Sequence, residues 1–172
     1  MHSTQTKKRK DLSQFDNSRY HKDSQGMTKA KSVRYLEEET FVALLRTADH
    51  LERRAAAMLK PNGLSPTQYN ALRILRGAGG DGLTCGEIGE RMLNHDPDIT
   101  RLLTRLERRG LIRRSRGQKD RRVITTRITS AGLNLLHSLD RPVEKFQRQL
   151  LCHVGKRGLQ SLIRLLKLAQ GK

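Results

Sequence analysis

The sequence predicts a mainly α-helical fold with one small β element, which places it in the α+β class. Apolar residues recur at helical spacing over most of the chain after residue 33, and helix start and stop signals divide them into several segments. Residues 111–128 differ from the rest, because β-branched residues and alternation there are typical of strands. No apolar run approaches the roughly 18 residues of a membrane-spanning helix, so we expect none.

The first periodic segment extends from about Val33 to Leu59. One face of the predicted helix carries residues that step by four, three, four and three: Leu44, Ala48, Leu51, Ala55 and Met58. Residues 1–30, in contrast, are polar and basic and show no apolar periodicity. We therefore expect residues 1–30 to form a disordered basic tail.

Two further helix starts follow. Ser65 and Pro66 predict the start of a second helix, because Ser is a good N-cap and Pro suits the first helical position. The glycine-rich run 77–82 ends this helix. Thr84, with Glu87 three residues later, matches the capping-box pattern and predicts a third, short helix.

A fourth helix is predicted over residues 97–109, with Gly110 as its C-terminal stop. The residues expected to point inward are apolar: Ile99, Leu102, Leu103 and Leu106. The residues expected to face outward are polar or basic: Thr100, Arg101, Thr104, Arg105 and Arg108. Asp98 lies beside this outward face, where its carboxylate could orient an arginine or accept a hydrogen bond from cytosine.

Segments 111–116 and 123–128 predict two strands, and the polar, basic residues 117–122 between them predict the tip of a hairpin. Thr129 or Ser130 then begins a long helix. Its apolar residues repeat at three and four, as in the seam of a coiled coil: Leu136, Leu139, Val143, Phe146 and Leu150. A last helix presents a further apolar set: Leu159, Leu162, Ile163, Leu166 and Ala169.

This order of elements is that of a winged helix-turn-helix, in which two short helices joined by a turn precede a β hairpin, the wing. We expect residues 61–129 to form the DNA-binding region. The chain has few aromatic residues with which to build a large core of its own, so burial of apolar surface by oligomerisation is expected.

The charge distribution indicates a polyanionic partner. The chain has 35 Lys and Arg residues against 17 Asp and Glu, a net charge of +18. Residues 1–34 carry nine basic and three acidic residues, and residues 96–128 carry eleven basic and four acidic residues. Nucleic acid fits such concentrations, because neutralising phosphates releases counterions. Membrane is not expected as a partner, since the basic segments lack a broad apolar face.

The predicted fourth helix and wing together suit double-stranded DNA. Arg can bind guanine through two hydrogen bonds, and Thr can contact a thymine methyl group in the major groove. Taken alone, these residues could equally be an ordinary solvated helix face. The hairpin tip makes DNA binding the stronger interpretation, because it adds a second basic element beside the helix: Lys119, Arg121 and Arg122.

The sequence resembles the MarR family of bacterial regulators over about residues 35–170. The resemblance is carried by the segments Leu64-Ser-Pro-Thr-Gln-Tyr, Ile-Thr-Arg-Leu-Leu-Thr-Arg-Leu-Glu-Arg-Arg-Gly-Leu-Ile-Arg-Arg, Asp-Arg-Arg and Ile-Thr-Ser-Ala-Gly132. It implies that Arg101 and Arg105 lie on the recognition helix. It also implies that Asp120 braces the wing by pairing with a nearby arginine, and that Arg122 enters the minor groove.

Only two cysteines occur, far apart in the sequence, and this favours a reducing cytoplasm. The resemblance further implies a homodimer that binds a pseudo-palindromic operator, with residues 31–60 and 130–172 as its dimerisation region. Such regulators usually repress, and many release DNA on binding a small phenolic or other lipophilic effector. An architectural, nucleoid-type protein with little sequence preference remains the alternative, and a protein-interaction module is a second one. No catalytic motif is visible, so we expect neither an enzyme nor a cofactor.

The cysteines and histidines give no clear site. Cys85 and Cys152 are expected to be buried free thiols that act as small hydrophobes. Redox sensing stays open for Cys85, because a helix N-terminus can lower the pKa of a thiol. The six histidines include no pair at metal-ligand spacing, so no metal is expected.

Overall fold

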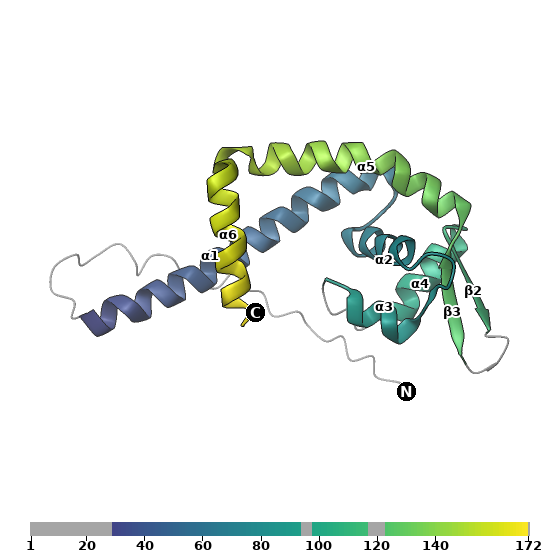
Figure 1. Ribbon diagram of the computed structural model, residues 1–172, viewed down its shortest axis with the longest axis horizontal. Coiled ribbons are helices and arrows are strands. Elements are labelled where there is room, and N and C mark those ends of the chain that lie inside the picture. The colour runs from purple at the N-terminus through teal and green to yellow at the C-terminus, as the bar shows by residue number, and fades with distance from the viewer. Residues whose placement is uncertain (1–28, 94–97, 117–122, 172) are drawn as a thin grey trace, which may run out of the picture. The chain divides into compact units, whose positions relative to one another are not determined.

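The computed structural model describes residues 29–93, 98–116 and 123–171. Most of them are helical, and three short strands form one sheet (Figure 1). The predicted α+β class is therefore confirmed. In chain order the elements are α1 (Lys29–Leu59), the 3-10 turn Lys60–Asn62, α2 (Pro66–Gly77), β1 (Leu83–Thr84), α3 (Cys85–Arg91), α4 (Ile99–Arg108), β2 (Ile112–Arg116), β3 (Ile124–Ile128), α5 (Ser130–Leu151), the 3-10 turn Cys152–Val154 and α6 (Gly155–Ala169).

Local sequence signals determine where α2 and α3 begin. The Ser65 hydroxyl accepts a hydrogen bond from the Gln68 backbone N–H at 3.1 Å, and the Gln68 side chain accepts one from the Ser65 N–H at 3.0 Å. Thr84 and Glu87 form the same reciprocal pair at α3, as the sequence predicted. The hydrogen bonds from Thr84 hold the pKa of the Glu87 carboxyl below its usual value.

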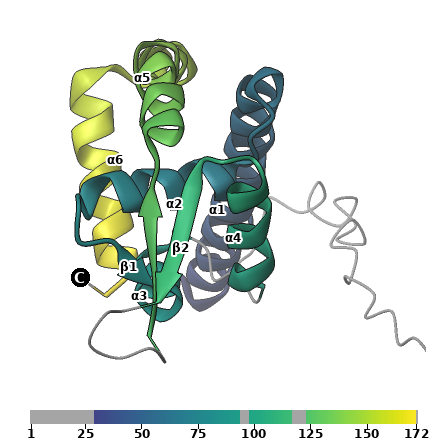
Figure 2. The same cartoon turned by 90° about the vertical axis from the view of Figure 1, so that its right-hand side faces the viewer.

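The sheet is antiparallel in the order β1-β3-β2. Strands β2 and β3 form the predicted hairpin (Figure 2). In its register Ile112 lies opposite Ile128 and Arg116 opposite Ile124. The sequence did not indicate β1, because two residues are too few to show the alternation of a strand. The hairpin tip falls outside the described residues.

The core lies among α2, α3, α4, the sheet and the first half of α5. It consists almost entirely of aliphatic side chains, among them Leu72, Leu75, Ile88, Leu103, Leu106, Ile112 and Leu136. The helix α5 begins directly against the sheet because Gly132 has no side chain. A Cβ atom at Gly132 would collide with the carbonyl oxygen of Leu111 and the side chain of Ile128.

Helices α1 and α6 leave apolar side chains exposed. On α1, Leu36 is 63% exposed and Phe41 is 62% exposed. On α6, which has no buried residue, Ile163 is 55% exposed and Leu168 is 65% exposed. The chain divides into two compact units within α1, after Thr47.

One sequence expectation about the cysteines is wrong. Cys152 is exposed, because it lies in the 3-10 turn after α5, beyond the residues of α5 that pack on the core. Cys85 is half-buried at the start of α3, and its Sγ lies 3.9 Å from the Thr100 Oγ1. None of the helices within the described ranges has the length and hydrophobicity that crossing a lipid bilayer requires.

Candidate nucleic-acid interface

The helix α4 is strongly amphipathic and presents one polar face to solvent. Leu102, Leu103 and Leu106 are buried, as the sequence predicted, and Ile99 is half-buried. The opposite face carries every residue predicted for the recognition helix. These residues line one open hollow on the surface of the molecule: Asp98, Thr100, Arg101, Thr104, Arg105 and Arg108.

Asp98 begins this helix and holds its first arginine. The Asp98 side chain accepts a hydrogen bond from the Arg101 backbone N–H at 3.2 Å, which makes it the N-cap of α4. A second contact joins the Arg101 Nε to the Asp98 Oδ2 at 3.3 Å. Of the two roles that the sequence left open for Asp98, the geometry supports the orientation of an arginine.

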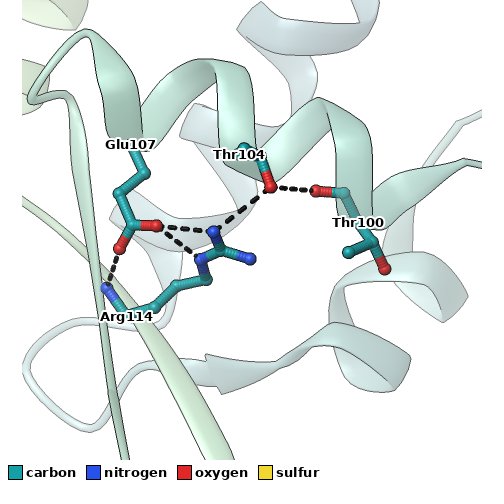
Figure 3. Close-up of polar contacts among 4 residues, drawn as sticks. All are labelled: Thr100, Thr104, Glu107 and Arg114. Atoms are coloured by element: carbon teal, nitrogen blue, oxygen red, sulfur yellow. Dashed lines mark hydrogen bonds and ion pairs between the residues drawn. The ribbon is translucent and has the colours of Figure 1, made fainter.

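Two charged side chains, Glu107 and Arg114, form a clamp that joins α4 to the wing strand β2. The Arg114 Nε donates to one carboxylate oxygen of Glu107 at 2.7 Å, and the Arg114 backbone N–H donates to the other at 2.9 Å (Figure 3). Both side chains are about two-thirds buried. These hydrogen bonds hold the pKa of the Glu107 carboxyl below its usual value.

The same guanidinium also reaches the exposed face of α4. The Arg114 Nη2 donates to the Thr104 Oγ1 at 3.2 Å, and the Thr104 hydroxyl donates to the Thr100 carbonyl oxygen at 2.9 Å (Figure 3). Neither Glu107 nor Arg114 was predicted from the sequence as a site residue. Spacing offers no signal for them, because the pairing depends on how β2 folds back onto α4.

Of the wing, the structure describes the strands β2 and β3. Arg113 and Arg116 on β2 are exposed. Arg127 on β3, which lies opposite Arg113 in the sheet, donates to the Gly80 carbonyl oxygen at 2.8 Å and to the Ser115 Oγ at 3.0 Å. The predicted tip residues lie outside the described residues: Lys119, Asp120, Arg121 and Arg122.

Arg109 fixes the other end of α4. Its guanidinium donates to the Gly63 carbonyl oxygen at 2.6 Å and to the Asn62 carbonyl oxygen at 3.1 Å. Helix α4 is thus attached to the turn between α1 and α2. The sequence could not indicate this role, because both acceptors are backbone atoms about 47 residues away in the chain.

A separate polar cluster joins α2 to α5. The Arg76 Nη1 donates to both carboxylate oxygens of Asp140, at 2.9 and 3.0 Å. Tyr69 lies nearby, and the guanidinium of Arg73 is 6.0 Å from the centre of its ring. Burial raises the pKa of the Tyr69 hydroxyl above its usual value. Within the described ranges, no group of three or more acidic, His or Cys side chains could hold a metal ion.

Comparison with known proteins identifies the family. The MarR family model matches residues 64–124, which extend from two residues before α2 to the first residue of β3. The chain is 26% identical to the homoprotocatechuate degradative operon repressor of Escherichia coli over 126 residues, which cover 73% of this chain and 84% of that protein.

Solved structures extend the match to most of the chain. A MarR transcription factor from Planctomyces limnophilus is 38% identical, with a TM-score of 0.61, over 76% of this chain and 95% of that one. MepR of S. aureus, solved as a complex with DNA, is 23% identical with a TM-score of 0.66, over 77% of this chain and 98% of that one. The chain therefore belongs to the MarR family of DNA-binding transcriptional regulators.

Proposed function

We propose that this chain is a homodimeric, sequence-specific repressor that binds a pseudo-palindromic operator and is released by a small effector. The observation that carries the proposal is the open face of α4, where six polar or charged residues lie together beside an exposed basic strand. In the major groove, about 12 Å wide, such a face can meet base edges. Asp98 orients Arg101, and Thr100, Arg105 and Arg108 extend the face.

The wing completes the proposed interface. Arg116 on β2 is exposed on the same side of the strand as Arg114, which contacts α4, and there it can contact phosphates. We assign minor-groove contact to Arg122, with the other tip residues Lys119 and Arg121 on the backbone and Asp120 as the brace. Narrow minor grooves concentrate negative potential and attract such an arginine.

Dimerisation is supported by the exposed apolar residues of α1 and α6. We assign residues 31–60 and 130–172 to the dimerisation region and 61–129 to the DNA-binding region. A two-fold dimer would place its two recognition helices about one turn of DNA apart, roughly 34–36 Å. Family membership favours a small phenolic or lipophilic compound as the effector. Such a compound would release DNA by binding more tightly to a dimer whose recognition helices have a different separation.

The test is a binding titration at several salt concentrations, comparing DNA from upstream of this protein's gene with a scrambled duplex of equal length. A preference of roughly 10³ or more near physiological salt would support a specific regulator. The double variant Arg101→Ala, Arg105→Ala should lose that preference. Arg148→Ala, which removes an arginine that is 79% exposed on α5, is the matched control and should keep it.

The second candidate is an architectural DNA-binding protein, which the net charge of +18 favours. Such a protein would bind both duplexes equally, and its affinity would fall steeply with salt for each. If the double arginine variant binds the upstream DNA with unchanged affinity and preference, the arginines of α4 do not read DNA, and this face is free to contact protein instead.

A further inference from the structure

We propose that Thr104 contacts DNA through its methyl group alone, selecting a thymine, and that Arg114 is the positioning residue that holds it in this role. The inference rests on the proposed binding of α4 in the major groove. It names one specificity-determining residue and the base that it selects. Its basis is the series of hydrogen bonds that runs from β2 across the exposed face of α4 (Figure 3).

The hydroxyl proton of Thr104 already has a partner. The Arg114 guanidinium, 3.2 Å away, can only donate, so the Thr104 oxygen must accept from it. The Thr100 carbonyl oxygen, 2.9 Å away, can only accept, so it takes the single hydroxyl proton. Thr104 therefore has no proton to offer to an acceptor on a base, such as the O6 of guanine or the O4 of thymine.

Arg114 prevents Thr104 from changing this arrangement. Its guanidinium cannot follow a rotating threonine, because Glu107 holds the Nε at 2.7 Å and the Nη2 at 2.6 Å. Turning the hydroxyl of Thr104 toward DNA would break two hydrogen bonds and leave the largely buried guanidinium with one partner fewer. Because Thr104 lines the open hollow on α4, the group it can offer there is its methyl group.

A methyl group in the major groove distinguishes thymine from the other bases, since only thymine carries a methyl group at C5. Contact between the two methyl groups removes apolar surface from water without requiring any proton. One buried methyl group stabilises by roughly 0.8 kcal/mol, which corresponds to about fourfold in affinity. The arginines of the same face remain available to bind guanine. On α4, arginines would therefore select guanine and Thr104 would select thymine.

The experiment uses the duplex that the full-length wild-type protein selects from a randomised pool. Each thymine of that duplex is replaced in turn by deoxyuridine, which removes only the C5 methyl group. We expect one thymine in each half-site at which the replacement weakens wild-type binding about fourfold. At that position Thr104→Ser should abolish the difference between thymine and uracil. Thr104→Val, which keeps a methyl group and lacks the hydroxyl, should retain it.

Matched variants separate this role from a general effect on stability. Thr100→Ser removes a methyl group from the same face and should leave the difference at that position unchanged. Arg114→Leu frees Thr104 and should bring the ratio of the two affinities toward one. Arg113→Leu, which removes the neighbouring exposed arginine, should not. Because both duplexes are measured with the same preparation, this ratio does not depend on the fraction of folded protein.

Three outcomes would overturn the inference. If Thr104→Val loses the selectivity while Thr104→Ser keeps it, the hydroxyl reads the base. If the protein selects a sequence but no thymine is sensitive to deoxyuridine, the methyl contact is absent while the proposed function stands. If the protein selects no sequence from the pool, the proposed function fails first and the inference fails with it.

Discussion

The winged helix-turn-helix part of the chain buries its apolar side chains, whereas helices α1 and α6 leave many of theirs exposed. Leu72 on α2 and Leu106 on α4 are completely buried within the chain. Leu36 on α1 and Leu168 on α6 are the same residue type, and each is more than 60% exposed. The first region is therefore stabilised by contacts within one chain, whereas in the second the described part of the chain leaves apolar side chains uncovered.

The difference also separates two contributions to the stability of the proposed repressor, one from folding and one from dimerisation. Burying a leucine side chain stabilises by roughly 1.5–3 kcal/mol. In the DNA-binding region this free energy belongs to folding and does not depend on protein concentration. In α1 and α6 it would be gained on dimerisation, so it depends on concentration.

The largest effect is expected from Leu72→Ala. The side chain is fully buried in α2, so its truncation leaves a cavity and should lower the free energy of unfolding by about 2–5 kcal/mol. Chemical denaturation followed by circular dichroism at two protein concentrations measures it. The loss should be the same at both concentrations.

Leu168→Ala makes the same chemical change on α6, where the side chain is 65% exposed in the single chain. Its effect on the free energy of unfolding should shrink as the protein is diluted below the dimer dissociation constant, because this apolar surface is buried only in the dimer. An equal, concentration-independent loss in both variants would remove the distinction between the two regions.

The next effect concerns dimerisation alone. Ile163→Asp places a carboxylate within the apolar face of α6, where burial against a partner would cost several kcal/mol. We expect the dimer dissociation constant to rise at least about 100-fold, measured by sedimentation equilibrium. Ser161→Asp adds the same charge at an exposed polar position and should change it little. A dimer that tolerates Ile163→Asp would show that α6 lies outside the interface.

Much of the DNA-binding region could be predicted from the sequence because its signals are local. The capping box of Thr84 and Glu87 lies within one turn of helix, and the inward set of α4 repeats at helical spacing. Such patterns fix an element before any tertiary contact forms. The same periodicity cannot tell whether an apolar face is covered within the chain or by a partner, so it did not distinguish α5 from α6.

The contacts that orient the interface could not be predicted, because they join distant residues. Arg113, Arg114 and Arg116 look alike in the sequence, yet only Arg114 pairs with Glu107. Which arginine reaches α4 depends on how β2 lies against that helix. Arg109 binds backbone carbonyl groups, and these leave no trace in a pattern of side chains. The sequence thus predicts the helices and strands better than the side-chain contacts that position them.

A smaller effect is expected where α2 meets α5. Arg76 binds both oxygens of Asp140, but the two side chains are 34% and 42% exposed, so solvent screens the pair. A double-mutant cycle with Arg76→Ala and Asp140→Ala should give a coupling free energy of about 0.5–1 kcal/mol. The exposed pair Arg148 and Glu144 within α5 is the control and should couple more weakly. Equal coupling would mean that the contact between helices adds nothing to an ordinary surface pair.

The smallest effect is expected in the pH dependence of the clamp between α4 and β2. Because hydrogen bonds from Arg114 lower the folded-state pKa of Glu107, the clamp stabilises fully above the ordinary glutamate pKa of about 4.3. This stabilisation should disappear as the pH falls through the lowered pKa. The difference in melting temperature between wild type and Glu107→Gln should therefore be present at neutral pH and shrink below about pH 4. Other acidic groups, including Glu87, titrate in both proteins and cancel in the comparison. A difference that stays constant with pH would mean that Glu107 contributes by shape rather than by charge, and that the wing does not rely on its carboxylate.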